Sequence, residues 1–432
     1  MSLKVAEKLN KVLGDNRKFC QGINIVSIGQ LRVGYNVDNF ATSASWHCLP
    51  SSTLPLAIQA KPSLAMTPTK RLSFPVLVVL AKSGTSSSRA RGGDDTLVLG
   101  GAPNQTNIFG NDGDDLISVE NSGSGALIDS KFFAGAGDDA VVLQDLVFTG
   151  TAQGTSQVGM AAGDDFIFLR GNFNNVNLFA NDGDDSISFT GTSSFQNSRA
   201  FTGDDDDFFT DNGFEVDFTN AELGFKGGDD TINLGNSITG SGDNGLEVFL
   251  GDGDDFFIGP ESGDLELMAG TGDDTITGGG TSDTFTGGEG ADLYIQASGA
   301  SASVDSVLGG QPGVPLTLTF AADPDIITDF QTAAGAGAPA DRIAFSGWAG
   351  PSNFNDNRSS ASGSFGSGNV VLYSGNFNET GNIFTTASNN SGPDVLAFLS
   401  TGTGNSPGDF GDQAFVLLDA SDQSFNPDTD FL

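Results

Sequence analysis

A short acidic turn recurs along this chain at a regular spacing. The string GNDGDDLIS at 110–118 returns as ANDGDDSIS at 180–188, LGDGDDFFI at 250–258 and AGTGDDTIT at 269–277. Aligned on the final aspartate, the turns are spaced by 19 to 26 residues until Asp274 and by 9 thereafter. They end at Asp95, Asp115, Asp139, Asp165, Asp185, Asp207, Asp230, Asp255, Asp274, Asp283 and Asp292. A period of this size is typical of solenoids and other repeat architectures.

Hydrophobic residues keep a fixed register to these turns although the spacing varies. Two residues after each final aspartate stand Leu97, Ile117, Val141, Ile167, Ile187, Phe209, Ile232, Phe257, Ile276, Phe285 and Tyr294. Seven residues before the aspartates from 115 to 274 stand Ile108, Phe132, Val158, Leu178, Ala200, Leu223, Val248 and Leu267. Each coil is therefore predicted to contain one strand before the acidic turn and one after it, with these side chains pointing inward.

The predicted fold is all-β: a right-handed parallel β-roll or β-solenoid with 20–26-residue coils, followed by a small β-rich C-terminal cap or tail. We expect a basic N-terminal segment at 1–91, the roll at 92–295, a β cap at 296–347 and a β-rich region at 348–432. Second turns such as GNFNN and GTSSFQN are predicted to form a variable edge. Three further strands are expected at NVVLYSG, DVLAFLS and QAFVLLDAS.

Charge is distributed unevenly. Residues 1–92 contain 12 basic and three acidic residues, whereas residues 93–432 contain six basic and 52 acidic residues. The net charge of −37 excludes nucleic acid and anionic membranes as partners and favours cations. The longest apolar run, at 72–81, is too short to span a membrane. Cys20 and Cys48 leave open whether a disulfide forms.

From residue 269 the turns become contiguous nonapeptides, AGTGDDTIT, GGGTSDTFT and GGEGADLYI. They resemble the G-G-x-G-x-D-x-U-x repeats of RTX proteins, secreted bacterial proteins in which such repeats form a calcium-binding parallel β-roll. The segment DIITDFQ…DRIAFSGW at 325–348 and the chain end resemble the region after the roll and the C-terminal secretion end of RTX exoproteins. The resemblance implies export by type I secretion machinery and a secreted, extracellular or cell-surface location.

The turns depart from the family pattern in several coils. Most coils have one acidic turn, so ions are expected mainly along one edge, with Asp283 on the other. Asp205 and Thr281 replace the fourth-position glycine. The second glycine is replaced in four turns, by Asn111, Ala161, Asn181 and Lys226. The sites of all these turns are expected to be weaker or empty.

Carboxylates and glycine carbonyls are the oxygen ligands that Ca²⁺ prefers, and stacked carboxylates about 4.8 Å apart repel one another without an ion. We expect several Ca²⁺ ions, up to about nine along one edge. The candidate ligands are Asp95, Asp112, Gly113, Asp115, Gly137, Asp139, Gly163, Asp165, Asp182, Gly183, Asp185, Asp205, Asp207, Gly228, Asp230, Asp252, Gly253, Asp255, Gly272, Asp274, Asp283, Gly290 and Asp292. Zinc is disfavoured because His47 is the only histidine.

Three functions are weighed. A calcium-loaded structural or surface protein that folds outside the cell is preferred. The alternative is a non-catalytic, adhesin-like module that binds polysaccharide or another surface, with its ligand on the asparagines and phenylalanines of the variable edge. A polysaccharide lyase or epimerase is a third candidate, but no catalytic residues are identified. A zinc protease helix needs two histidines, so the single histidine excludes it. A serine hydrolase would have to use His47, and the sequence has no GxSxG nucleophile elbow to support one.

Overall fold

The computed structural model describes part of the chain. The described residues are 77–81, 86–90, 92–100, 105–120, 126–151, 156–240, 244–280, 282–296, 303–309, 314–322, 324–332, 340–359, 366–387, 391–402, 410–420 and 423–432. Cys20, His47, Cys48 and Thr281 lie outside them. Within the described part there is no α-helix, and hence none long and apolar enough to cross a membrane; two short 3₁₀ turns occur, η2 (Pro351–Asn353) and η3 (Glu379–Gly381).

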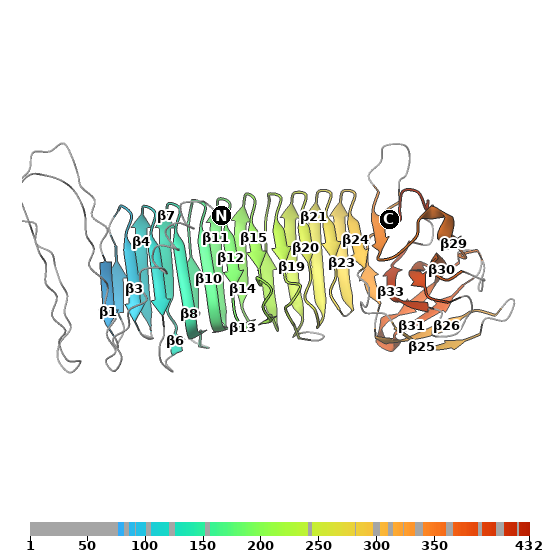
Figure 1. The fold of residues 1–432 in the computed structure, drawn as a ribbon, viewed down its shortest axis with the longest axis horizontal. Helices are drawn as coiled ribbons and strands as arrows, with labels where there is room; N and C mark the ends of the chain where they lie inside the picture. The colour runs from blue at the N-terminus through green and yellow to red at the C-terminus, as the bar shows by residue number, and fades with distance from the viewer. Residues whose placement is uncertain are drawn as a thin grey trace, which may run out of the picture.

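The strands that follow the acidic turns form the first sheet of a parallel β-solenoid (Figure 1). Each strand pairs with the equivalent strand of the next coil, so that Ile117, Val141, Ile167 and Ile187 lie in one register. In order, the strands are β1 (Leu77–Ala81), β3 (Thr96–Gly100), β5 (Leu116–Glu120), β8 (Ala140–Thr149), β10 (Phe166–Asn174), β12 (Ser186–Phe189), β15 (Phe208–Thr210), β18 (Thr231–Asn233), β20 (Phe256–Ile258), β22 (Thr275–Thr277), β24 (Leu293–Gln296) and β28 (Arg342–Phe345).

The strands that precede the acidic turns form the second sheet, also parallel. In order they are β2 (Ser86–Arg89), β4 (Thr106–Asp112), β7 (Lys131–Ala136), β9 (Ser156–Gly159), β11 (Val176–Asp182), β14 (Arg199–Asp204), β17 (Ala221–Gly224), β19 (Leu246–Asp252), β21 (Leu265–Thr271), β23 (Asp283–Glu289) and β27 (Asp325–Ile327). The predicted all-β, parallel solenoid is confirmed. Because β1 and β2 pair with β3 and β4, strands of the roll begin before residue 92.

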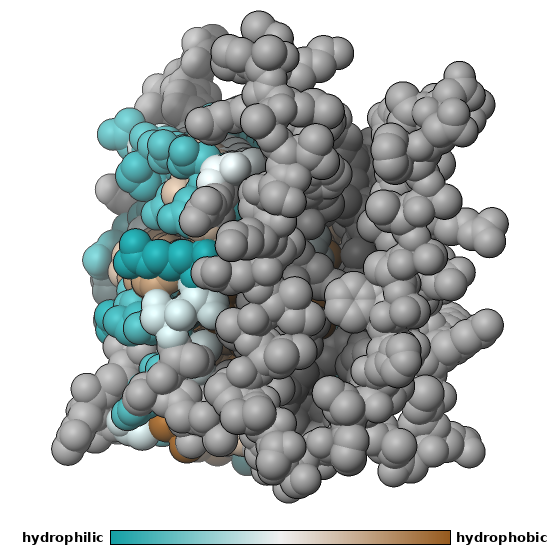
Figure 2. Space-filling view, turned by 90° about the vertical axis from the view of Figure 1, so that its left-hand side faces the viewer, coloured by the Kyte–Doolittle hydropathy of each residue, from teal (hydrophilic) through white to brown (hydrophobic). Residues whose placement is uncertain are grey.

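The core lies between the two sheets and follows the predicted register. All eleven positions two residues after the turns are at most 1% exposed, as are all eight positions seven residues before them. A period of two within each strand thus fixes which side chains point inward, independently of loop length. Viewed along the roll from its N-terminal side, the described surface is mainly hydrophilic, with small hydrophobic areas (Figure 2).

The variable edge differs from the prediction. Instead of turns alone, it contains the short strands β6 (Ala126–Ile128), β13 (Ser193–Gln196) and β16 (Val216–Asp217), and the far halves of β8 and β10. Three of its phenylalanines point inward: Phe173, Phe195 and Phe218 are 0% exposed and lie 5.4–6.3 Å from the ring of Phe189. For these three the expectation of ligand binding is wrong, because the rings fill the core. Phe214, on the same edge, is 42% exposed.

The C-terminal region extends the second sheet with antiparallel strands and lies at one end of the roll (Figure 1). β27 pairs in parallel with both β23 and β33 (Phe410–Leu417), which joins roll and C-terminal sheet. The other strands are β25 (Ser303–Leu308), β26 (Thr317–Ala322), β29 (Phe354–Asp356), β30 (Val370–Asn378), β31 (Ile383–Thr386) and β32 (Asp394–Ser400). The three strands predicted in this region are confirmed as β30, β32 and β33.

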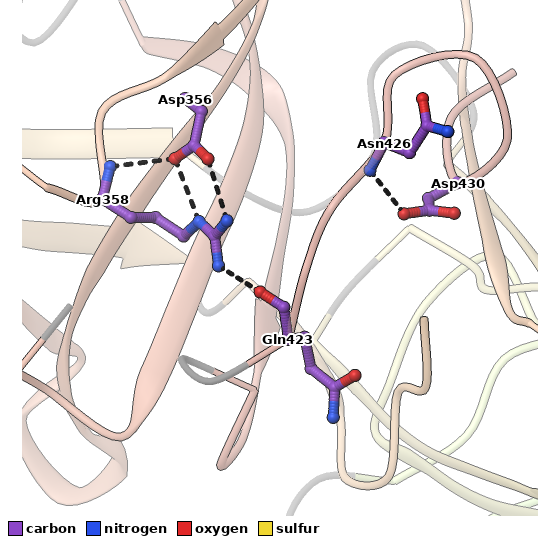
Figure 3. A network of polar contacts seen from close by, with 5 residues as sticks. All are labelled: Asp356, Arg358, Gln423, Asn426 and Asp430. Carbon is purple, nitrogen blue, oxygen red and sulfur yellow. Dashed lines mark hydrogen bonds and ion pairs between the residues drawn. The ribbon is translucent and has the colours of Figure 1, made fainter. Parts of the chain in front are cut away.

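A buried arginine ties together the C-terminal segments (Figure 3). Arg358, 6% exposed, donates Nε and Nη2 to the two carboxylate oxygens of Asp356 at 2.9 and 2.8 Å and Nη1 to the Gln423 carbonyl at 2.7 Å. Its guanidinium carbon lies over the Phe425 ring, 4.6 Å from the ring centroid. Nearby, the Asn426 N–H donates to Asp430.

Candidate calcium-binding edge

The final aspartates of successive turns form a hydrogen-bonded ladder along one edge of the roll. In each step the backbone N–H of one aspartate donates to Oδ1 of the final aspartate one coil later, at 2.6–3.1 Å. The bonds run without a break from Asp95 to Asp292 and then to Asp341 in the C-terminal region. The sequence analysis placed ten of these aspartates on one edge, and the structure brings those ten together.

The second carboxylate oxygen of this ladder is buried. In seven of the aspartates, Oδ2 has no hydrogen-bond partner, and the residues are 1–3% exposed. These seven are Asp165, Asp185, Asp207, Asp230, Asp255, Asp274 and Asp292. An ionised carboxylate in such a place is costly unless a cation or a proton compensates its charge.

Burial is accordingly the main cause of raised pKa values in these seven carboxyls. The pKa rises from 3.8 to about 9 at Asp165, about 8 at Asp185, Asp230 and Asp274, about 7 at Asp207 and Asp255, and about 6 at Asp292. Hydrogen bonds to the carboxylates act against the rise, and neighbouring aspartates add to it. Without a cation, the neutral carboxyl is thus favoured at several coils near pH 7.

A second ladder is formed by the aspartates that directly precede the final ones. Here the direction is reversed: Oδ1 of one aspartate accepts from the backbone N–H of the equivalent residue one coil later, as from Asp229 to Asp206 at 2.9 Å and from Asp254 to Asp229 at 3.0 Å. Eight such bonds of 2.8–3.4 Å occur between Asp94 and Ala291. Sequence reasoning assigned these residues no structural role, but the repeated Asp-Asp pair supplies both ladders.

The turn glycines are required by close stacking of the coils. Eight of the fourth-position glycines have φ between 119° and 151°, and a Cβ atom on any of these eight would collide with the backbone of the equivalent residue one coil earlier. They are Gly113, Gly137, Gly163, Gly183, Gly228, Gly253, Gly272 and Gly290. Asp205 occupies the same position with φ 81°, a conformation that an L-residue rarely adopts.

Other predicted ligands lie outside the ladders. Asp112, Asp182, Asp205 and Asp252 are exposed. The backbone carbonyls of Asp112, Asp182 and Asp252 accept from fourth-position glycines of neighbouring coils at 2.6–3.0 Å, so these residues contribute to the turn through their main chain.

On the opposite edge, Asp283 is joined by a residue that sequence reasoning did not assign. The Asp283 N–H donates to Oδ1 of Asp325 at 3.1 Å, and both residues are at most 2% exposed. Burial and the adjacent Asp325 carboxylate raise the pKa of Asp283 well above 3.8. This edge thus repeats the ladder step of the main edge over a single pair of coils.

Two aspartates of the C-terminal region, neither predicted as a ligand from the sequence, bind the last coil at the end of the main ladder. Oδ2 of Asp341 accepts from the Gln331 N–H at 2.7 Å, so both of its oxygens are hydrogen-bonded. Asp329 accepts from the N–H groups of Gly287 and Gly288 at 3.0 and 2.8 Å. Asp341 could have been found from the sequence, because Ile343 follows it by two residues as in every coil of the roll.

The donor set of the main edge fits a hard cation. Most of its buried unpartnered atoms are carboxylate oxygens, accompanied by the hydroxyls of Thr202 and Tyr294, and its turns are built on glycine. Among the described residues no group of three or more acidic, histidine or cysteine side chains converges on one point. An ion here would therefore be held by Oδ2 of the ladder aspartates, with backbone carbonyls of the turns or water completing its coordination.

Comparison with known families identifies the repeat. Residues 266–294 match the family model of the RTX calcium-binding nonapeptide repeat, in four copies. This part of the parallel β-solenoid carries RTX calcium-binding nonapeptide repeats. No curated protein and no solved structure matched the chain. The RTX match covers the three contiguous nonapeptides, whereas the roll strands extend from residue 77 to residue 345.

The RTX roll varies at the first position of its turns. Where this position is glycine, at Gly110 and Gly287, the Oδ2 atoms of Asp115 and Asp292 fill the space that a Cβ would occupy. In most other coils of this edge the position holds a buried apolar residue, such as Met160 or Leu250, and in the Asp207 coil it holds the buried Thr202. The carboxylates of those coils therefore lie in more apolar surroundings than the family pattern provides.

Proposed function

We propose that this protein is a secreted structural or surface protein whose RTX roll folds when Ca²⁺ binds outside the cell. RTX repeats and the solenoid support calcium binding. The observation that carries the proposal is the row of seven buried carboxylates whose Oδ2 atoms have no partner. Consecutive ladder aspartates, such as Asp185 and Asp207, would hold the ions, which supply the positive charge that the edge lacks.

Folding would then depend on the calcium concentration. An unfolded chain with a net charge of −37 repels itself, and the stacked turns that bind the ion exist only in the folded state. Ion binding and folding are therefore one equilibrium. Extracellular calcium modules typically bind in the range of about 10⁻⁴–10⁻³ M, well above the free calcium of a cell interior.

Export before folding is the second part of the proposal. Phe431, near the chain end, is 2% exposed and forms a parallel bridge with Ile343 on the last coil. An export signal at this end would be accessible to type I secretion machinery only in the unfolded chain. Folding by calcium outside the cell keeps the end accessible until export is complete.

We propose no catalytic activity. RTX repeats are typically non-catalytic, and the paired aspartates of the turns take part in hydrogen-bonded ladders.

The experiment is a calcium titration of the full chain, followed by far-UV circular dichroism and small-angle scattering. Strand signal and an elongated shape should appear together as calcium rises into the millimolar range. Magnesium serves as the control, because it favours a tighter octahedral site and retains its waters. Equal strand content in chelator and in millimolar calcium would overturn the proposal.

A further inference from the structure

One face of the roll differs in chemistry from the rest of the molecule. It is formed by side chains that point outward from β2, β4, β7, β9, β11 and β14. These side chains form two rows along the roll. In each coil, one row stands eight residues and the other six residues before the final aspartate of the turn. We call it the aromatic face. The first row is Ser87, Asn107, Lys131, Gln157, Asn177 and Arg199, and the second is Arg89, Phe109, Phe133, Gly159, Phe179 and Phe201. Neither row contains a carboxylate, in a chain with 55 acidic residues.

The second row repeats every three coils. Phe109 and Phe133 stack with centroids 5.5 Å apart and an interplanar angle of 18°, and the next coil has Gly159. Phe179 and Phe201 stack at 5.9 Å and 17°, and the next coil has Gly224. The two stacked pairs lie three coils apart, which is about 14 Å along the roll. All four rings are partly exposed.

Packing explains only part of this pattern. The rings of Phe133 and Phe201 lean over Gly159 and Gly224, where an added Cβ would come within 2.9 and 2.6 Å of the ring. Aromatic cover of a strand glycine is a known stabilising device. A leucine would cover the glycine as well, however. Phe109 also packs against the Arg89 guanidinium, which lies 4.5 Å from its ring centroid. Among the described residues no cation lies over Phe179, and packing does not require a polar row without acids.

The polar row beside the rings supplies neutral and basic donors. Asn107, Gln157 and Asn177 carry amides that both donate and accept hydrogen bonds. Lys131 makes no ion pair with any described residue, and Arg199 pairs with Glu222 at 2.9 Å where the carboxylate-free stretch ends. Beyond it the same row becomes acidic, with Glu247 and Glu266.

We propose that the aromatic face binds a neutral, extended polysaccharide that lies along the roll axis. Pyranose rings present apolar C–H faces that pack on aromatic rings, and hydroxyls that amides and cationic groups can hydrogen-bond. A net charge of −37 opposes binding of nucleic acid and acidic polysaccharides, and it also opposes face-to-face pairing of two copies of this chain. This inference rests on the proposed surface role and specifies its ligand.

The test uses the full chain in millimolar calcium and measures adsorption to cellulose and chitin, with alginate as the acidic comparison. The double variant Phe133→Leu, Phe201→Leu keeps apolar cover over the glycines but removes the flat rings. We expect adsorption to the neutral polymer to fall about tenfold or more. The matched control is Phe208→Leu, Phe256→Leu, two rings on the outer face of the first sheet that are 42% and 40% exposed; it should bind as the wild type does.

The outcomes separate this inference from the calcium proposal. Circular dichroism reports calcium-dependent folding independently, so a folded wild type that adsorbs to none of the polymers overturns only the polysaccharide inference. Unchanged adsorption by the Phe133→Leu, Phe201→Leu variant overturns it as well. So does a dimer in sedimentation that this variant dissociates, because the occupant of the face would then be a second copy.

Discussion

The backbone N–H of Asp207 donates to Oδ1 of Asp230 at 2.8 Å, while Oδ2 of Asp230 is buried without a partner. One oxygen of the carboxylate thus joins two coils, and the other requires a cation or a proton. The same division of roles holds at the six other ladder aspartates with an unpartnered Oδ2. It makes coil stacking and ion binding inseparable, and it leads to specific expectations for substitution and for pH.

Asp185→Ala should destabilise the roll beyond its own coil. The substitution removes the acceptor of the Asp165 N–H, at 2.8 Å, and leaves that buried donor unsatisfied, a cost of about 1–3 kcal/mol. It also removes a ligand that neighbouring coils would share. We expect a higher calcium midpoint and a lower folding cooperativity in a calcium titration followed by circular dichroism.

Asp185→Asn is the matched control, because an amide oxygen can still accept from the Asp165 N–H but carries no charge. It should retain coil stacking and need less calcium at neutral pH, while binding fewer ions in calorimetry. Identical behaviour of the alanine and asparagine variants would contradict the two roles assigned to the carboxylate.

Acid should replace calcium as the stabiliser of the roll. The seven ladder carboxyls have folded-state pKa values of about 6 to about 9, above the value of 3.8 expected in the unfolded chain. Between these values the folded state binds more protons, so their contribution to stability is fully present below pH 3.8 and is lost as pH rises through about 6 to 9. In chelator, strand content should therefore be highest in acid and fall across that range, whereas saturating calcium should remove the loss. Circular dichroism from pH 4 to 9 measures this, and calcium-free protein that is more stable at pH 9 than at pH 5 would exclude it.

Much of the roll could be predicted from its sequence because the strand period fixes which residues face the core. Positions such as Ile187 and Leu178 keep their offset from the aspartate whatever the loop length, and both are 0% exposed. The variable edge could not be predicted in the same way. There Phe173 and Phe195 follow turn-forming residues, and only stacking against neighbouring coils shows that they lie in strands and fill the core.

The ligand set was predicted less completely than the fold. The repeated glycines and aspartates identified the edge. The direction of each hydrogen bond depends on how neighbouring coils stack, however, so the sequence did not predict the second ladder through Asp206 and Asp229. Asp325 and Asp341 stand 42 and 49 residues after their partners Asp283 and Asp292, so a search at the repeat spacing does not find them.

Asp205→Gly should stabilise the roll. Asp205 has φ 81°, which costs an L-residue roughly 1–2 kcal/mol and costs glycine little. We expect a higher melting temperature in calcium, with the two ladders intact because Asp205 belongs to neither. Gly272→Ala, at φ 131° against the Gly253 carbonyl, is the opposite test and should destabilise. A lower melting temperature for Asp205→Gly, together with the loss of one bound ion, would instead make Asp205 a ligand.

Asp356→Asn should loosen the C-terminal region and leave the roll unchanged. Burial acts to raise the pKa of Asp356, but its hydrogen bonds and charge interaction with Arg358 outweigh this and lower the pKa. Neutralising Asp356 leaves the guanidinium of Arg358, which is 6% exposed, without its charge partner, at a cost of about 1–3 kcal/mol. Because the folded-state pKa is lowered, the stabilisation should also be lost in the wild type as pH falls below the usual carboxyl range.

For the Asp356→Asn variant, amide hydrogens around β29 and the Gln423–Asp430 segment should exchange faster than in the wild type, with protection in β10 to β20 unchanged. The matched control is Asp145→Asn, which removes the partner of the exposed Arg170 and should have little effect. Equal protection of the C-terminal segments in the Asp356→Asn variant and the wild type would show that Arg358 holds them through the Gln423 carbonyl and the Phe425 ring, without the charge of Asp356.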